Sequence, residues 1–355
     1  MILTELKIHN LRNISLAHLE LNSRFNFISG ANGSGKTSIL EALYLLSCGH
    51  SFRSREISPL VTHGHASFTV FARAAQQETI SIQKSSSQLT QIKLNNQFCS
   101  STSQLAYALP CQIFYSDIFQ IIYAGASIRR SVLDWGLFHV KHNYLALLKD
   151  YKRVLKHRNA LLKKHAPYAH FIPWDKQLSE LAEQLDYLRR DYFGLWEQEF
   201  TKVLSKLSNL SCSISYFKGW DKRNSGKTLT AILEENFESD NHKLYTQYGA
   251  HQADIVIESN ESKAKQILSR GQQKIILMAL KLAQGNLVEQ DCLYLLDDLP
   301  AELDELHQQK VLSYLASRKG QYIITTNADI ARLRSYCKNE PVQSYQISAG
   351  VAQVN

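Results

Sequence analysis

The sequence predicts an α/β fold with two lobes, one built on a mixed sheet around a phosphate-binding loop and one mainly helical with a short arm. Three observations predict it. A phosphate-binding loop lies at residues 30–37 of the 355-residue chain, and an acidic strand end lies far away at residues 292–298. Long helical periodicity fills much of the sequence between them. Both chain ends are therefore expected to share one sheet, which the middle of the chain leaves and rejoins.

The first motif reads Gly30-Ala31-Asn32-Gly33-Ser34-Gly35-Lys36-Thr37. It fits G-x-x-x-x-G-K-[ST] at every fixed position, between an alternating strand pattern at 24–29 and a helical pattern at 36–47. Glycines let the backbone N–H groups turn toward phosphate oxygens, and the positive end of the following helix adds to the field. We expect Lys36 to reach the β- and γ-phosphates and the Thr37 hydroxyl to ligate Mg²⁺. A glycine-rich turn without nucleotide is the alternative, which this context disfavours.

Residues 1 to about 110 are predicted as alternating strands around the loop and its helix, joined by polar connections. A second Ser-Gly-Lys-Thr sequence at 225–228 is interpreted as a surface turn. Asp221 stands where the first glycine would be needed, and no apolar strand leads into it.

The pattern changes to long helices from Asp117 onward. One helix is predicted over residues 144–165, and apolar residues at three-and-four spacing over 178–196 predict another. The pair could form a short antiparallel arm, although ordinary core packing would give the same pattern. The predicted domains are lobe I over residues 1–116 and 213–355 and helical lobe II over residues 117–212, with the alternative that 213–270 belongs to lobe II.

A helix start that suits phosphate capture lies at Ser269-Arg270-Gly271-Gln272-Gln273, before a helical stretch at 274–284. Serine is a favoured cap, and the free N–H groups of a helix N-terminus attract anions. We therefore include Ser269, Arg270, Gly271 and Gln272 among the expected nucleotide-binding residues, while an ordinary capped helix remains the alternative.

The acidic strand end completes the set of motifs. Residues 292–296 are a short apolar run typical of a strand buried on both faces, followed by Asp297 and Asp298. Asp297 is expected to hold hydrated Mg²⁺ together with Thr37. Asp298 is expected to polarise the attacking water, so Asp298 and Lys36 are the predicted catalytic residues. The three motifs in this order predict an ATPase head of the ABC type, with ATP and Mg²⁺ as cofactors.

Composition favours a polyanionic partner. The formal net charge is +8 and the sequence pI is about 9.0. Basic residues gather between residues 129 and 164, opposed by Asp134 and Asp150. Nucleic acid would favour such clustering through counterion release, although a solvated basic surface has the same composition. The basic residues counted in this cluster are Arg129, Arg130, Lys141, Lys152, Arg153, Lys156, Arg158, Lys163 and Lys164.

Other patterns restrict the class of protein. The six cysteines form no C-x-x-C pair, which indicates a reducing compartment and no zinc site. No apolar run approaches the roughly 18 to 20 residues of a membrane span, and no secretory signal pattern opens the sequence. We expect a cytoplasmic protein without a membrane partner.

The chain resembles the RecF family of DNA replication and repair ATPases, which are short-armed relatives of SMC and Rad50 heads. The distinctive run is Arg-Arg-x-x-Leu-Asp-Trp-Gly-Leu-Phe-His at residues 129–139, for which a transport ATPase has no use. Ala301, the missing switch histidine after residues 325–327 and several missing prolines depart from the family pattern, and they leave the hydrolysis rate open. The other matching runs are residues 6–13, 30–41, 49–54, 155–162, 268–274, 297–298 and 301–304.

The resemblance implies a function. Members dimerise on ATP by placing each signature helix against the partner's nucleotide, bind duplex or gapped DNA, act with RecO and RecR, and help load RecA. A weak DNA-stimulated ATPase is expected. The alternatives are a scaffold that binds ATP, hydrolyses it little and acts through protein partners, or another ABC-type ATPase. Candidates for DNA or nucleotide contact are Arg12, Asn13, Arg53 and Arg55, with Lys152, Arg153 and Lys156 on the arm.

Overall fold

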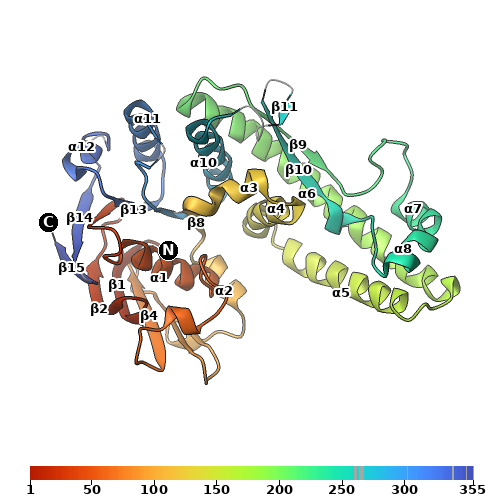
Figure 1. Ribbon diagram of the computed structural model, residues 1–355, viewed down its shortest axis with the longest axis horizontal. Coiled ribbons are helices and arrows are strands. Elements are labelled where there is room, and N and C mark those ends of the chain that lie inside the picture. Colours follow the sequence, from red (N-terminus) through yellow and green to blue (C-terminus); the bar gives the residue numbers. More distant parts are fainter. Residues whose placement is uncertain (260–261, 264–267, 302, 338–339, 349, 355) are drawn as a thin grey trace. The chain divides into compact units, whose positions relative to one another are not determined.

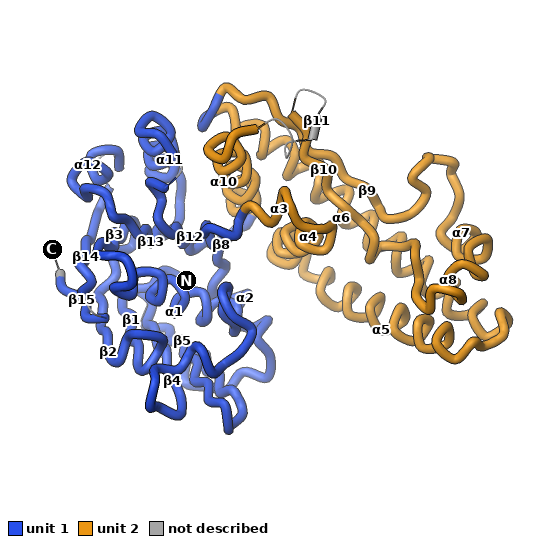
Figure 2. The backbone as a smooth tube through the Cα atoms, viewed as in Figure 1, with its two compact units in different colours: residues 1–118, 206–208, 288–355 blue, residues 119–205, 209–287 orange. Residues whose placement is uncertain are grey.

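The computed structural model describes residues 1–259, 262–263, 268–301, 303–337, 340–348 and 350–354. The chain forms two compact units, coloured separately in Figure 2. Unit 1 consists of residues 1–118, 206–208 and 288–355, and unit 2 of residues 119–205 and 209–287.

One of the two sheets of unit 1 is a mixed sheet of six strands (Figure 1). Its order is β15-β14-β3-β13-β12-β8, with parallel pairing throughout except between β14 and β15. Every residue of β12 and β13 is buried, as expected for strands covered on both faces. The strands are β3 (Phe25–Ser29), β8 (Cys111–Phe114), β12 (Leu293–Leu296), β13 (Gln321–Thr326), β14 (Val342–Ser348) and β15 (Val351–Val354).

A second, antiparallel sheet of unit 1 has the order β2-β1-β4-β5-β6-β7. Helix α1 (Lys36–Cys48) contacts strands of both sheets, and ten of its 13 residues are buried, so it forms the centre of the core. The strands are β1 (Leu3–Leu11), β2 (Ile14–Glu20), β4 (Ser67–Ala74), β5 (Thr79–Ser85), β6 (Gln91–Leu94) and β7 (Gln97–Phe98). The remaining helices are α2 (Thr102–Ala108), α11 (Glu305–Ala316) and α12 (Ile330–Ser335).

Unit 2 is mainly helical. Its helices α5 (Tyr144–Leu162) and α6 (Ile172–Leu207) run antiparallel, because His157 stacks on Trp174 near one end while Arg189 donates to Tyr144 at the other. Strands β9 (Ser213–Phe217), β10 (Asp254–Ser259) and β11 (Ser262–Lys263) form a separate sheet. The other helices are α3 (Gln120–Tyr123), α4 (Ala126–Val140), α7 (Leu229–Glu235), α8 (Phe237–Lys243) and α10 (Arg270–Asn286).

The predicted fold class, an ABC-type α/β head with a helical second lobe and a helix-pair arm, is confirmed by this architecture and by the structural neighbours described below. The compact units depart from the predicted 213–355 segment of lobe I, since residues 209–287 belong to unit 2, and they agree with the stated alternative that 213–270 belongs to lobe II. Strands β9 and β10 pair with each other and with β11 instead of extending the mixed sheet. Helix α5 also ends at Leu162 and not at 165, where His165 adopts a φ of 50°.

Candidate phosphate-binding site

The candidate site lies where the parallel strands β3, β12 and β13 end. Thr326 of β13 is level with Ser29 of β3, and Leu296 of β12 is level with Ile324 of β13. The residues that follow each strand therefore meet at the carboxyl edge of the sheet. This is the edge at which open α/β sheets bind ligands.

The loop after β3 has a conformation that requires glycine. Gly30 has a φ of 152°, and a Cβ there would collide with the Ile347 carbonyl and the Ser34 hydroxyl. Gly35 caps α1 with a φ of 117°. The buried Ser34 hydroxyl has no hydrogen-bond partner among the described residues. The loop thus carries a polar group that is ready for a ligand atom, at the positive end of α1.

Lys36 is held at the centre of this loop. Its ammonium donates to the carbonyls of Gly30 at 2.6 Å and Ala31 at 3.0 Å, and to Oδ1 of Asn327 at 2.7 Å. Burial lowers the pKa of Lys36, and the negative charges of Asp298 and Asp297 oppose that shift. The amide of Asn327 also donates to Oδ1 of Asn32 at 3.0 Å, so it joins the two ends of the site.

The two acids follow β12 as predicted. The Thr37 hydroxyl lies 3.0 and 3.2 Å from the two oxygens of Asp297, and a hydroxyl with a carboxylate is the kind of donor set that suits Mg²⁺. The Thr325 hydroxyl donates to Asp297 at 2.8 Å and accepts from the backbone N–H of Asp298 at 2.8 Å. Asp298 has a φ of 46°, a conformation that is costly for a residue with a side chain and that is fixed here by this bond.

Two site residues, Thr325 and Asn327, were given no role by the sequence analysis. Asn327 was noted only because histidine was missing there. The signal that identifies them is register: Thr325 lies near the end of β13 and Asn327 follows it, and because β13 pairs with both β3 and β12, the two residues lie beside the loop and the acids. Glu302, in the family run at residues 301–304, lies outside the described residues.

Arg12 and Asn13 act inside unit 1. Asn13 donates to the Gly33 carbonyl at 2.9 Å and accepts from the Ser38 hydroxyl at 2.9 Å, so it braces the loop. Arg12 forms a two-pronged ion pair with the fully buried Glu41 of α1, at 2.9 and 2.8 Å. By contrast, Arg53 and Arg55 are exposed and remain available for a ligand.

The predicted signature residues begin α10 in unit 2. The Ser269 hydroxyl accepts from the Gln272 backbone N–H, and the Gln272 side chain accepts from the Ser269 N–H, which forms a capping box. The Arg270 guanidinium lies over the Phe119 ring at 4.6 Å. Ser269, Arg270 and Gln272 are exposed, and Gly271 is partly so. This helix end can therefore be reached by a second molecule.

Charge counting overestimated the basic surface of unit 2. Arg158 has no exposed surface and pairs with Asp175 at 2.6 Å and Asp240 at 2.7 Å. Arg129 pairs with Asp254, and Lys141 with Asp191. Partners outside the 129–164 window neutralise these charges, which the sequence could not place. The cluster members that are exposed are Lys152, Arg153, Lys156, Lys163 and Lys164, with Arg153 bonded to Asp150 at 2.9 Å.

Among the residues that the structure describes, no helix has the length and apolarity required to span a bilayer.

Several known proteins are similar to this chain. The model of the RecF/RecN/SMC N terminal domain family matches residues 2–337. The chain is 38% identical over 333 residues to the DNA replication and repair protein RecF of Francisella tularensis subsp. tularensis (strain WY96-3418), a match that covers 92% of this chain and 95% of that protein. The protein of the same name from Francisella tularensis subsp. novicida (strain U112) matches with the same identity and coverage.

Solved structures give the same answer. The recombination mediator protein RecF with ATP, from the RecFOR pathway, superposes with a TM-score of 0.84 at 27% identity, covering 100% of this chain and 97% of that one. An Smc head bound to the C-winged helix domain of ScpA gives a TM-score of 0.63 at 16% identity, covering 100% and 97%. The second similarity concerns the fold alone.

Proposed function

Since this chain belongs to the RecF branch of the RecF/RecN/SMC N-terminal domain family, we propose that it is an ATP-switched DNA-binding protein of recombinational repair and replication restart. One observation carries the proposal: four side chains meet at a single sheet edge, around a loop whose buried Ser34 hydroxyl finds no partner among the residues described. The four are Lys36, Thr37, Asp297 and Asn327. A phosphate chain supplies the anion that this arrangement lacks, and the RecF relative was solved with ATP.

The residues divide the work of nucleotide binding. The loop N–H groups and the N-terminus of α1 receive the phosphates, and Lys36 exchanges its carbonyl and amide acceptors for phosphate oxygens. Thr37 and Asp297 would hold Mg²⁺, which neutralises charge on the phosphates when it is bound. Asp298, turned by its bond to Thr325, orients the attacking water.

ATP-dependent dimerisation is the proposed switch. The exposed N-terminus of α10 offers Ser269, Arg270, Gly271 and Gln272 to the nucleotide of a second copy, as in ABC-type heads. A dimer that needs two nucleotides at its interface forms only when ATP is present. DNA affinity then follows ATP occupancy, because ATP favours the state that binds DNA.

The DNA surface is proposed on exposed cations of both units: Arg53 and Arg55 in unit 1, and Lys152, Arg153 and Lys156 along α5 in unit 2. Double-stranded and gapped DNA are the proposed substrates. RecR, together with RecO, and indirectly RecA are the proposed partners. The RecFOR pathway of the solved relative supports the first two.

The test is the anisotropy of a labelled gapped duplex titrated with the protein, with and without ATP and Mg²⁺, at two salt concentrations. We expect binding that requires ATP and weakens as salt rises, because each phosphate contact releases counterions. DNA binding of equal affinity with and without ATP would contradict the proposed ATP switch. An absence of binding under every condition would contradict the DNA-binding proposal and favour a scaffold that acts through protein partners.

A specific observation favours a second candidate, a scaffold that binds ATP and acts mainly through protein partners. The side chain that follows β13 and reaches Lys36 is the amide of Asn327, which takes up no proton near neutral pH. Slow hydrolysis is expected from either candidate. A DNA-stimulated ATPase favours the switch, whereas turnover that DNA leaves unchanged favours the scaffold.

A further inference from the structure

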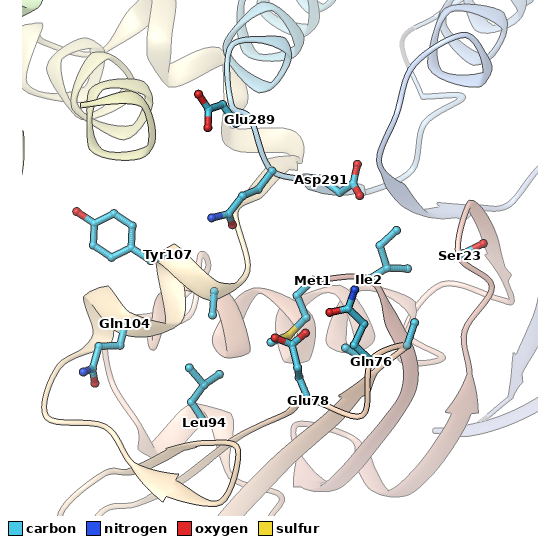
Figure 3. Close-up of a pocket in the computed structure, with 14 residues that line it drawn as sticks. Met1, Ile2, Ser23, Gln76, Glu78, Leu94, Gln104, Tyr107, Glu289 and Asp291 are labelled. Carbon is cyan, nitrogen blue, oxygen red and sulfur yellow. The ribbon is translucent and has the colours of Figure 1, made fainter. Parts of the chain in front are cut away.

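A pocket of about 860 Å³ opens at the end of unit 1 opposite the phosphate-binding groups (Figure 3). Asp291 lines it just before β12, whereas Asp297 follows the same strand. Ser23 lines it before β3, whereas Gly30 follows β3. The pocket therefore lies at the amino ends of the parallel strands, and none of its lining residues belongs to the candidate phosphate site.

The walls of this pocket are fixed by buried hydrogen bonds. The side chain of Gln321, only 2% exposed, accepts from the N–H of Leu3 at 2.9 Å and donates to the carbonyls of Leu3 and Asn22 at 2.7 and 2.8 Å. The Ala75 N–H donates to the Ile2 carbonyl at 2.9 Å, which ties the β4–β5 turn to the start of β1. A preformed site of this kind loses little conformational entropy on binding.

The charge of the pocket lining is opposite in sign to the net charge of the whole chain. Three carboxylates belong to the lining residues, with Glu289 and Asp291 on one side of the pocket and Glu78 across from them in Figure 3. The lining side chains include no lysine, arginine or histidine, so these three negative charges are opposed by the single positive charge of the Met1 α-ammonium, and among the described residues none of the three carboxylates has an ion-pair partner. The chain as a whole carries +8. The potential here therefore attracts cations and repels nucleic acid.

The floor is apolar and half-buried, formed by Met1, Ile2 and Leu94. The side-chain amides of Gln76 and Gln104 stand beside it, and each can both donate and accept a hydrogen bond. Main-chain groups of a peptide need both kinds of partner. The volume falls within the range of about 300 to 1,000 Å³ that is typical of ligand sites.

From these features we infer that the pocket is a docking site for a segment of a partner protein that places a lysine or arginine directly beside an apolar side chain. The cation pairs with the carboxylate rim, the apolar group covers Met1, Ile2 and Leu94, and the backbone bonds to the glutamine amides. None of the lining residues belongs to the phosphate site or to the proposed DNA surface. The inference does not rest on the proposed function.

The test uses a fluorescein-labelled peptide, Gly-Lys-Leu-Arg-Leu-Lys-Gly, followed by anisotropy on the full chain. A peptide with serine in place of both leucines has the same charge and lacks the apolar groups. The pocket variant combines Glu78→Gln, Glu289→Gln and Asp291→Asn. The control variant combines Glu197→Gln, Glu234→Gln and Glu238→Gln, which removes three exposed carboxylates from unit 2.

We expect the leucine peptide to bind wild type and the control alike, and the pocket variant at least about tenfold more weakly. Leu94→Ala is expected to weaken the leucine peptide and to leave the serine peptide unchanged. Equal binding of the two peptides, equal loss in the control variant, or no binding to wild type would each overturn the inference. Unchanged thermal midpoints of the variants show that they are folded.

Discussion

The phosphate site of unit 1 and the buried charges of unit 2 use similar residues in opposite ways. In unit 1, the hydrogen bonds of Lys36 and Asp297 can be exchanged for those of a ligand, and the buried Ser34 hydroxyl of the same loop has no partner in the part of the chain that the structure describes. In unit 2, Arg158 is fully buried and is bound by two aspartates and the Thr246 hydroxyl. The first arrangement awaits a ligand, and the second supplies the counter-charges within its own fold.

The difference explains the distinctive family run at residues 129–139. Asp134 accepts from Arg189 and from the Tyr144 hydroxyl, and Arg129 pairs with Asp254. A Cβ at Gly136 would collide with the hydroxyl of Tyr192. The run therefore builds unit 2, and its paired charges contribute to the stability of that unit. A charge in a sequence indicates function only when its partners are known.

The most severe test of the comparison is Arg158→Ala. Removing the guanidinium leaves the buried carboxylates of Asp175 and Asp240 without it, which typically costs about 3 to 5 kcal/mol. We expect the free energy of unfolding, measured by urea denaturation, to fall by that amount. Arg153→Ala on the same helix, where the side chain is exposed, is expected to change it by less than about 0.5 kcal/mol. Equal effects of the two changes would refute the assignment of Arg158 to the core.

Lys36→Ala tests the ligand-facing side of the comparison. The folded state loses only hydrogen bonds to two carbonyls and the Asn327 amide, whereas the ATP complex loses a charged contact to phosphate. We expect ATP affinity, measured by calorimetry, to fall about 100-fold, or about 2.7 kcal/mol, and ATP-dependent dimerisation to disappear. The exposed Lys319→Ala is the matched control. If the Lys36 variant kept its ATP affinity, the assignment of the nucleotide-binding site to this loop would be wrong.

A smaller effect concerns the pH dependence of stability, to which the buried His251 of unit 2 contributes. Burial lowers the pKa of His251 to about 4, although the contact of its Nε2 with the Thr246 carbonyl at 2.9 Å opposes that shift. The unfolded chain, with a histidine pKa near 6.5, binds this proton first, so stability is present above about pH 6.5 and is lost as pH falls toward 4. Between pH 7 and 5 the loss is about 2 kcal/mol for this histidine.

The measurement is urea denaturation of wild type and His251→Gln at both pH values. The variant should lose about 2 kcal/mol less than wild type when the pH is lowered. His139, whose pKa burial also lowers to about 4, contributes in the same direction in both proteins and cancels in the difference. An identical pH dependence of the two proteins would show that His251 titrates normally in the folded state.

Sequence predicts local elements well and their partners poorly. The loop, α1 and β12 could be placed because G-x-x-x-x-G-K-[ST] and an apolar run ending in acids are local patterns. Thr325 and Asn327 could not, because their role depends on β13 pairing between β3 and β12. The burial and pairing of Arg158 could not be predicted for the same reason, since its partner Asp240 lies 82 residues away in sequence.

The smallest expected effect concerns the exposed cations of α5. Reversing Lys152, Arg153 and Lys156 to glutamate should weaken binding of gapped DNA about tenfold and reduce the slope of log affinity against log salt by up to about 3, one for each lost phosphate contact. A control with Lys222, Arg223 and Lys243 reversed changes the net charge equally at other exposed positions of unit 2.

Anisotropy gives both the DNA affinity and its salt dependence, and sedimentation with ATP reports dimerisation, which should persist in both variants. Equal loss of DNA binding in the control would mean that only net charge acts, and loss of dimerisation would mean that α5 and the ATP-dependent interface are not separate surfaces. If the arm variant alone weakens DNA binding, the exposed part of the basic cluster has the function that counting charges had assigned to all of it.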